Sequence, residues 1–320
     1  MRFYSAGSAN HGSRISPVSY VAIFLTLALL TIGIAASIAT KFDFASLPNI
    51  ILLVIGVAIL DVTSQFAPPT RIVEALQTFL YGFLYLAVTI VCGVFAAYAM
   101  QRLAFPLQDR LLDYADKALG FQWFDYAYWV DDHALLQQIF YVAYHSIMVQ
   151  TLLPLVVLVC ANRIGDLRRY LLAYAIAFVF TIIVSALMPA AGPIALVDRA
   201  TFHILQFTGA TPLDHLARLR DAGPLVFDSA PGGIATFPSF HATIAILTPL
   251  ALRPFPLIFI ALLFLNAFML GATVTEGAHY LVDIIAGSGI AFVAYGVAKR
   301  ILVLEDQHEL AGRNIAAKEC

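Results

Sequence analysis

Apolar segments long enough to cross a lipid bilayer recur along this 320-residue chain. A transmembrane helix needs about 20 mostly apolar residues, because lipid offers no partner for free backbone groups. Charged residues make up only 12% of the chain, against about a quarter in soluble domains. The sequence therefore predicts an all-α, polytopic integral membrane helical bundle. We expect about eight spans, centred on residues 20–39, 49–67, 74–100, 137–161, 170–189, 240–252, 256–274 and 279–303.

The connection between the third and fourth expected spans mixes apolar, aromatic and charged residues. It contains the run LQDRLLDYADKALGFQWFDYAYWVDD, which is typical of an amphipathic helix lying in the membrane interface. Its aromatic residues suit the headgroup level of a bilayer. The residues from 192 to 238 instead carry repeated Gly and Pro, and these predict a turn-rich cap rather than helix. The first apolar run is either a signal peptide or an uncleaved helix, and its length favours the helix.

The short connection ANRIGDLRRY between the fourth and fifth expected spans is rich in arginine. It holds Arg163, Arg168 and Arg169 with only Asp166 to oppose them. Positively charged short loops stay in the cytoplasm, so this connection and both chain termini are expected on the cytoplasmic side. The protein is then expected in an inner or plasma membrane. The two long connections are expected on the non-cytoplasmic face.

The stretch EGAHYLVDIIAG, residues 276–287, places polar groups in an apolar segment. His279 and Asp283 are four residues apart and share one helix face. A second histidine, His241, follows Ser239 at the start of the sixth expected span. The orientation above brings both histidines to the non-cytoplasmic face. His145, inside the fourth expected span, is either a substrate contact or a histidine bonded to a backbone carbonyl.

These residue types suit phosphoryl transfer. A neutral imidazole is a nucleophile, and a carboxylate on its other nitrogen stabilises the positive charge that develops. His279 and Asp283 fit these two roles, while His241 fits that of a general acid and base. Ser239 is a plausible N-cap, so the first-turn amides of its helix would face an arriving anion. The set predicts a phosphohistidine intermediate.

PSFHA and GAHYLVDIIAG resemble the second and third signature motifs of the type 2 phosphatidic acid phosphatase superfamily. HYLVD followed by IIAG is most similar to the branch that contains inositol phosphorylceramide synthases, and MPAAGP at residues 188–193 resembles the proline-rich element of that branch. The resemblance covers roughly residues 137–301. It implies a six-helix catalytic core in which His279 is the nucleophile, Asp283 its partner and His241 the proton donor. It also implies that neither a metal ion nor another cofactor takes part.

The chain departs from that superfamily pattern in its cations. The phosphatases carry an arginine six residues before the third-motif histidine, where this chain has Thr273. The first motif, of the K-x6-R-P form, is missing too. Thr273 then lines the phosphate position without a charge, and Arg199 is the first candidate to replace the lost cation, followed by Arg218 and Arg220. The departure favours a transferase over simple phosphatidate hydrolysis.

We therefore expect a membrane lipid phosphotransferase that acts on a lipid phosphate or phospholipid. Its acceptor would be a lipid or polyol hydroxyl, and a sphingolipid is one option. A lipid phosphate phosphatase and a non-enzymatic transporter or scaffold remain open alternatives. A net charge of −2 argues against a nucleic-acid partner. The expected regions are a leader at 1–19, N-terminal helices with the interfacial segment at 20–132, a catalytic membrane domain at 133–304 and a tail at 305–320.

Overall fold

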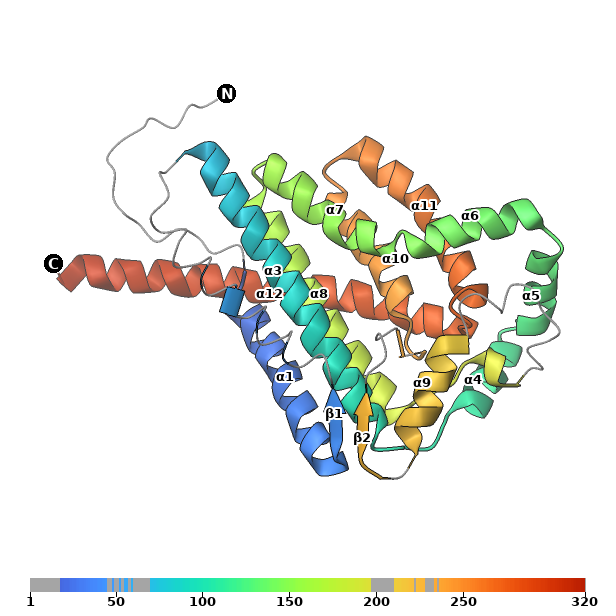
Figure 1. The fold of residues 1–320 in the computed structure, drawn as a ribbon. Coiled ribbons are helices and arrows are strands. Elements are labelled where there is room, and N and C mark those ends of the chain that lie inside the picture. The colour runs from blue at the N-terminus through green and yellow to red at the C-terminus, as the bar shows by residue number, and fades with distance from the viewer. Residues whose placement is uncertain are drawn as a thin grey trace.

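The computed structural model describes residues 18–44, 70–196, 210–221, 223–227, 233–234 and 236–319, with residues 48, 52, 55, 56 and 59. The described chain is a bundle of α-helices with one short strand pair, so the all-α prediction is confirmed (Figure 1). The elements are α1 Tyr20–Thr40, β1 Phe42–Phe44, α3 Arg71–Gln101, α4 Asp109–Ala118, α5 Trp123–Asp131, α6 Ala134–His145, α7 Ile147–Cys160, α8 Ile164–Leu187, η1 Pro193–Leu196, α9 Ala210–Arg220, β2 Leu225–Phe227, α10 Phe240–Leu252, α11 Pro256–Thr275 and α12 Leu281–Glu319.

Five described helices are long and apolar enough to cross a membrane, namely α1, α3, α8, α11 and the first 28 residues of α12. The expected span at 137–161 is broken into α6 and α7, which meet at a bend of 49°. The expected span at 240–252 is α10, a shorter apolar helix of 13 residues. Most of the expected span at 49–67 lies outside the described residues. Up to six spans are therefore described.

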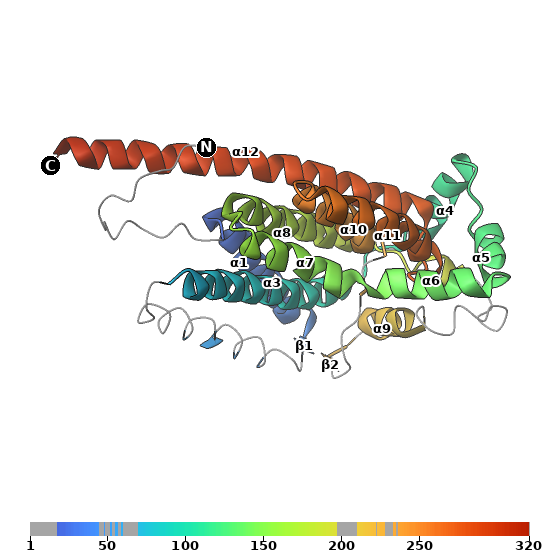
Figure 2. The same ribbon diagram turned by 90° about the horizontal axis from the view of Figure 1, so that it is seen from above.

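α10 lies at the centre of the bundle. It packs against α7, α8, α11 and α12, while α1 packs against α3 and α3 against α8. α4 and α5 lie at one end, which we call the site end, where α10 and α12 begin (Figure 1). In Figure 2, α12 runs along one side of the bundle, with α9, β1 and β2 on the other. The start of the short central helix α10 therefore lies next to the start of α12.

Local sequence signals explain where α10 and α11 begin. Ser239 is the N-cap of α10, and its Oγ accepts a hydrogen bond of 3.4 Å from the Ala242 N–H, so the predicted cap is confirmed. Pro256 occupies the first turn of α11, where its missing N–H costs nothing. A turn of three residues joins the two helices, which is the tight hairpin that the RPFP sequence predicts.

α10 and α12 approach each other closely at Gly287. A Cβ added there would lie 2.1 Å from the backbone oxygen of Ser239. The Thr243 hydroxyl, which donates to the Gly287 carbonyl at 2.9 Å, fixes the same contact. Gly287 lies one helical turn beyond Asp283, so both residues lie on the same face of α12, while His279 lies in the loop just before this helix.

Substitution of Gly287 by alanine should separate α12 from α10, because the new methyl group meets a backbone atom that cannot rotate away. We expect a loss of about 1–3 kcal/mol in stability together with loss of activity, measured as thermal unfolding of the purified protein and as turnover. Gly289→Ala is the matched control, since a Cβ there meets nothing within 4 Å. Equal effects of the two substitutions would contradict the close packing.

The segment expected to form one interfacial helix is two helices. α4 ends near Gly120, which has a positive φ of 78°, and α5 begins at Trp123. The single-helix prediction for residues 101–132 is therefore wrong, because the chain leaves the helix at the turn around Gly120. The prediction that residues 192–238 form no helix is also wrong, because α9 lies within them. Nothing in the sequence indicated the strand pair, in which β1 and β2 run parallel with Phe42 opposite Leu225.

At the end of the bundle away from the site end, Arg168 joins three elements. It is buried in α8 and pairs with Glu305 at 3.2 Å and Asp306 at 3.1 Å on α12. The Ser19 hydroxyl, at the N-cap of α1, donates to Glu305 at 2.7 Å. α12 continues as a helix to Glu319, so the expected tail at 305–320 begins inside a helix.

Candidate active site

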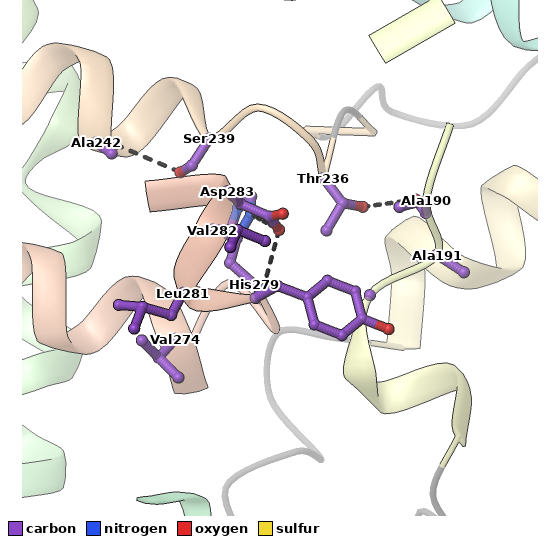
Figure 3. Close-up of polar contacts among 12 residues, drawn as sticks. Ala190, Ala191, Thr236, Ser239, Ala242, Val274, His279, Leu281, Val282 and Asp283 are labelled. Atoms are coloured by element: carbon purple, nitrogen blue, oxygen red, sulfur yellow. Dashed lines mark hydrogen bonds and ion pairs between the residues drawn. The ribbon is translucent and has the colours of Figure 1, made fainter. Parts of the chain in front are cut away.

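His279 and Asp283 are hydrogen-bonded at the start of α12. The Nδ1 atom of His279 lies 3.1 Å from Oδ2 of Asp283, as Figure 3 shows. The same oxygen accepts from the Tyr280 N–H at 3.0 Å. His279 is 5% exposed and Asp283 is fully buried. With Nδ1 engaged, Nε2 is the imidazole nitrogen left for chemistry.

The start of α10 is fixed to the same pair. The Ser239 N–H donates to the backbone carbonyl of Asp283 at 3.0 Å. Because Ser239 is the N-cap, the first-turn amides of α10 lie beside the start of α12, and such amides carry partial positive charge. A helix N-terminus of this kind stabilises a bound anion.

His241 comes to this site through a stack on Tyr144. The two rings lie 4.0 Å apart between centroids and only 8° from parallel. A Cβ on Gly277 would lie 3.1 Å from the Tyr144 Oη and 2.5 Å from Cδ2 of His279. Tyr144 thus contacts His241 with its ring, while its hydroxyl lies next to the loop that presents His279.

His145 is the last residue of α6, directly before the bend to α7. Its Nδ1 lies 2.8 Å from the Tyr141 carbonyl, which is the carbonyl-bonded arrangement expected as an alternative. The side chain is exposed. Burial raises the pKa of the Glu276 carboxyl, and the His145 charge partly opposes that shift. His145 therefore lies at the margin of the site.

The MPAAGP element lies against the loop that carries His279. Gly192 has a positive φ of 86°, and a Cβ there would lie 2.4 Å from the Ala278 carbonyl oxygen, so this position needs glycine. The Thr236 hydroxyl donates to the Ala190 carbonyl at 2.7 Å (Figure 3). The element therefore links the loop before α10 to the loop before α12.

The expected cation positions are not brought to His279 by the described residues. Thr273 is fully buried, and its hydroxyl donates to the Met269 carbonyl at 2.7 Å. The backbone carbonyl of Thr273 accepts from the His279 N–H at 3.4 Å, so Thr273 contributes to the conformation of the loop before α12. Arg220 donates to the carbonyls of Ala104 and Phe105, and Arg218 is exposed on α9. Arg199 lies outside the described residues.

Three residues at the site escaped the sequence analysis, namely Tyr144, Asp109 and Asp116. Asp109 accepts from the Ala191 and Gly192 N–H groups at 3.0 and 2.8 Å and from the Tyr280 hydroxyl at 3.2 Å. Burial raises the pKa of the Tyr280 phenol, and the Asp109 charge adds to that shift, so the phenol remains a donor. The spacing of Asp109 and Asp116, seven residues apart on one face of an amphipathic helix, could have indicated that both aspartates face the same part of the bundle.

A helical membrane bundle with a buried histidine–aspartate pair beside a second histidine is the class of protein that this fold and site define. Residues 110–297, more than half of the chain, match the family model of the PAP2 superfamily. The chain belongs to that superfamily, whose members are typically phosphatases or phosphotransferases acting on lipid-like substrates. The match begins in α4, upstream of the expected catalytic domain at 133. No curated protein and no solved structure matches the chain.

Proposed function

We propose that this protein is a membrane lipid phosphotransferase that works through a covalent intermediate on His279. The observation that carries the proposal is the hydrogen bond between His279 and the fully buried Asp283. It engages Nδ1 and leaves Nε2 as the nucleophile. Membership of the PAP2 superfamily supplies the phosphorus chemistry and the lipid-like substrate.

The reaction has two displacements at phosphorus. In the first, Nε2 of His279 bonds to phosphorus, the bond to the departing lipid oxygen breaks, and His241 gives that oxygen a proton. Asp283 stabilises the imidazolium that forms. In the second, His241 takes a proton from an acceptor hydroxyl, whose oxygen bonds to phosphorus as the bond to His279 breaks. The first-turn amides of α10 stabilise the negative charge on the phosphoryl oxygens in both steps.

The acceptor decides the product. A lipid or polyol hydroxyl gives a new phosphodiester, as in the inositol phosphorylceramide synthase-like branch, whereas water gives hydrolysis. Thr273 replaces the arginine of the phosphatase pattern and turns its hydroxyl toward Met269, which leaves that position without a cation. The missing cation supports transfer over hydrolysis. From the arginine-rich connection, we place the reaction on the non-cytoplasmic face.

In the test, the purified protein is placed in lipid vesicles. Phosphatidate, phosphatidylinositol or a polyprenyl diphosphate is then supplied as substrate, each with and without ceramide or diacylglycerol. Free phosphate and new phospholipid are recorded by mass spectrometry, in EDTA. New phosphodiester lipid that requires an acceptor supports the transferase. Free phosphate without an acceptor identifies a lipid phosphatase, and no product from any lipid would favour a transporter or scaffold.

A further inference from the structure

α4 has two different faces. Asp109, Leu112 and Asp116 are buried on one of them, and Leu112 packs with Ala190 and Tyr280. Their spacing of three and four residues gathers them toward the start of α12. The other face exposes Leu111 and Tyr114 together with Arg110 and Lys117.

On the inner face, Asp116 binds the first turn of α12. Its Oδ2 accepts from the Leu281 N–H at 2.8 Å, and its Oδ1 accepts from the Val282 N–H at 2.9 Å. Asp116 is 2% exposed. The first N–H groups of a helix have no partner within the helix, so this carboxylate fills both positions from a different segment. The two amides lie between His279 and Asp283 in sequence, and any shift of this turn moves both.

The segment that precedes α4 indicates what its outer face contacts. α3 is a candidate membrane span that ends at Gln101, and α4 follows within eight residues. The connection exposes Leu103, Phe105 and Leu107. Exposed apolar side chains beside basic ones, directly after a span, fit the boundary between headgroups and acyl chains.

We propose that α4 couples the lipid surface to the site, with Asp116 as the positioning residue that holds the first turn of α12. Lipid contact on Leu111 and Tyr114 fixes α4. Asp116 then fixes Leu281 and Val282, and with them the orientation of His279 toward phosphorus. The kinetic part of this inference rests on the proposed function.

The experiment uses the full chain in phosphatidylcholine vesicles and compares Asp116→Asn, Asp116→Ala and a doubly substituted Leu111→Ser, Tyr114→Ser protein. Asp113→Asn is the matched control, because this carboxylate lies on the same helix and forms its ion pair with the half-exposed Lys117 at 2.6 Å. Hydrogen exchange of the amides at residues 281–283 is measured by mass spectrometry. We expect exchange to rise about tenfold in Asp116→Ala and less in Asp116→Asn. It should also rise in the lipid-face variant and stay unchanged in the control.

Phosphatidate turnover supplies the second readout. We expect kcat to fall about 100-fold in Asp116→Ala, with partial recovery in Asp116→Asn and little change in KM. Unchanged exchange in Asp116→Ala or in the lipid-face variant would overturn the coupling. A raised KM with kcat preserved would overturn the positioning role. If the wild-type protein leaves phosphatidate and the other lipid phosphates untouched, the proposed function fails, while hydrogen exchange still decides the coupling.

Discussion

Replacement of His279 by alanine should abolish turnover, with a loss of at least about 1,000-fold, because the nucleophile of a covalent mechanism has no substitute. The fold should survive, since His279 lies in the loop before α12 and only its Asp283 bond is lost. The check is turnover on the lipid that the vesicle assay identifies as substrate, together with mass spectrometry of the peptide that contains residue 279 after an alkaline quench. The wild-type peptide should carry a phosphoryl group or phospho-headgroup that the variant lacks.

His133→Ala is the control for that variant, because His133 is exposed at the start of α6 and its side chain contacts the ring and the carbonyl of Trp129. Its turnover should match the wild type. A His279→Ala protein that keeps a tenth of the wild-type turnover would refute the nucleophile assignment and favour a binding or transport function.

Asp283→Asn should lower kcat by at least about 100-fold. Both hydrogen bonds of the carboxylate go to Oδ2, and Oδ1 has no partner within the described part of the chain. An asparagine whose amide oxygen takes the Oδ2 position therefore keeps both bonds and loses only the charge. The loss then measures how strongly that charge stabilises the imidazolium. The measurement is single-turnover kinetics of the first displacement.

Asp306→Asn is its matched control on the same helix, since Asp306 is exposed at the far end and pairs with Arg168. We expect Asp306→Asn to retain full turnover. If Asp283→Asn retains it as well, the carboxylate only orients His279, and the charge does not act in the transition state.

The fold class and several helix limits were predictable because they depend on local composition. Apolar runs located α1, α3, α8, α11 and α12, and Ser239 marked the start of α10 through its capping bond. The bend between α6 and α7 was not predictable, since no glycine or proline lies there. The contacts at the bend are the tertiary stack of Tyr144 on His241 and the hydrogen bonds of Ser146. The end of α4 was not predicted either, because the turn at Gly120 lies within a segment that otherwise looks helical.

The site was predictable where it depends on residues close in sequence. The spacing of His279 and Asp283 predicted their contact, which the hydrogen bond confirms. The prediction that both lie on one helix face is wrong, because α12 begins at Leu281 and leaves His279 in the loop before it. Contacts across the bundle were beyond the sequence, because an aspartate on an amphipathic helix gives no sign of which backbone amides it will meet. Asp116 is the clearest example, since its partners lie 165 and 166 residues away.

α12 is clamped at two points. Asp116 holds its first turn at Leu281, and Arg168 holds Glu305 near the opposite end of the bundle. At 1.5 Å per residue these points lie about 36 Å apart, slightly more than the hydrocarbon core of about 30 Å. The length of the helix between these two contacts is therefore fixed. With α4 at the lipid surface, as proposed above, we expect a bilayer with much longer acyl chains to place His279 below the headgroups, so that membrane thickness affects which lipids reach it.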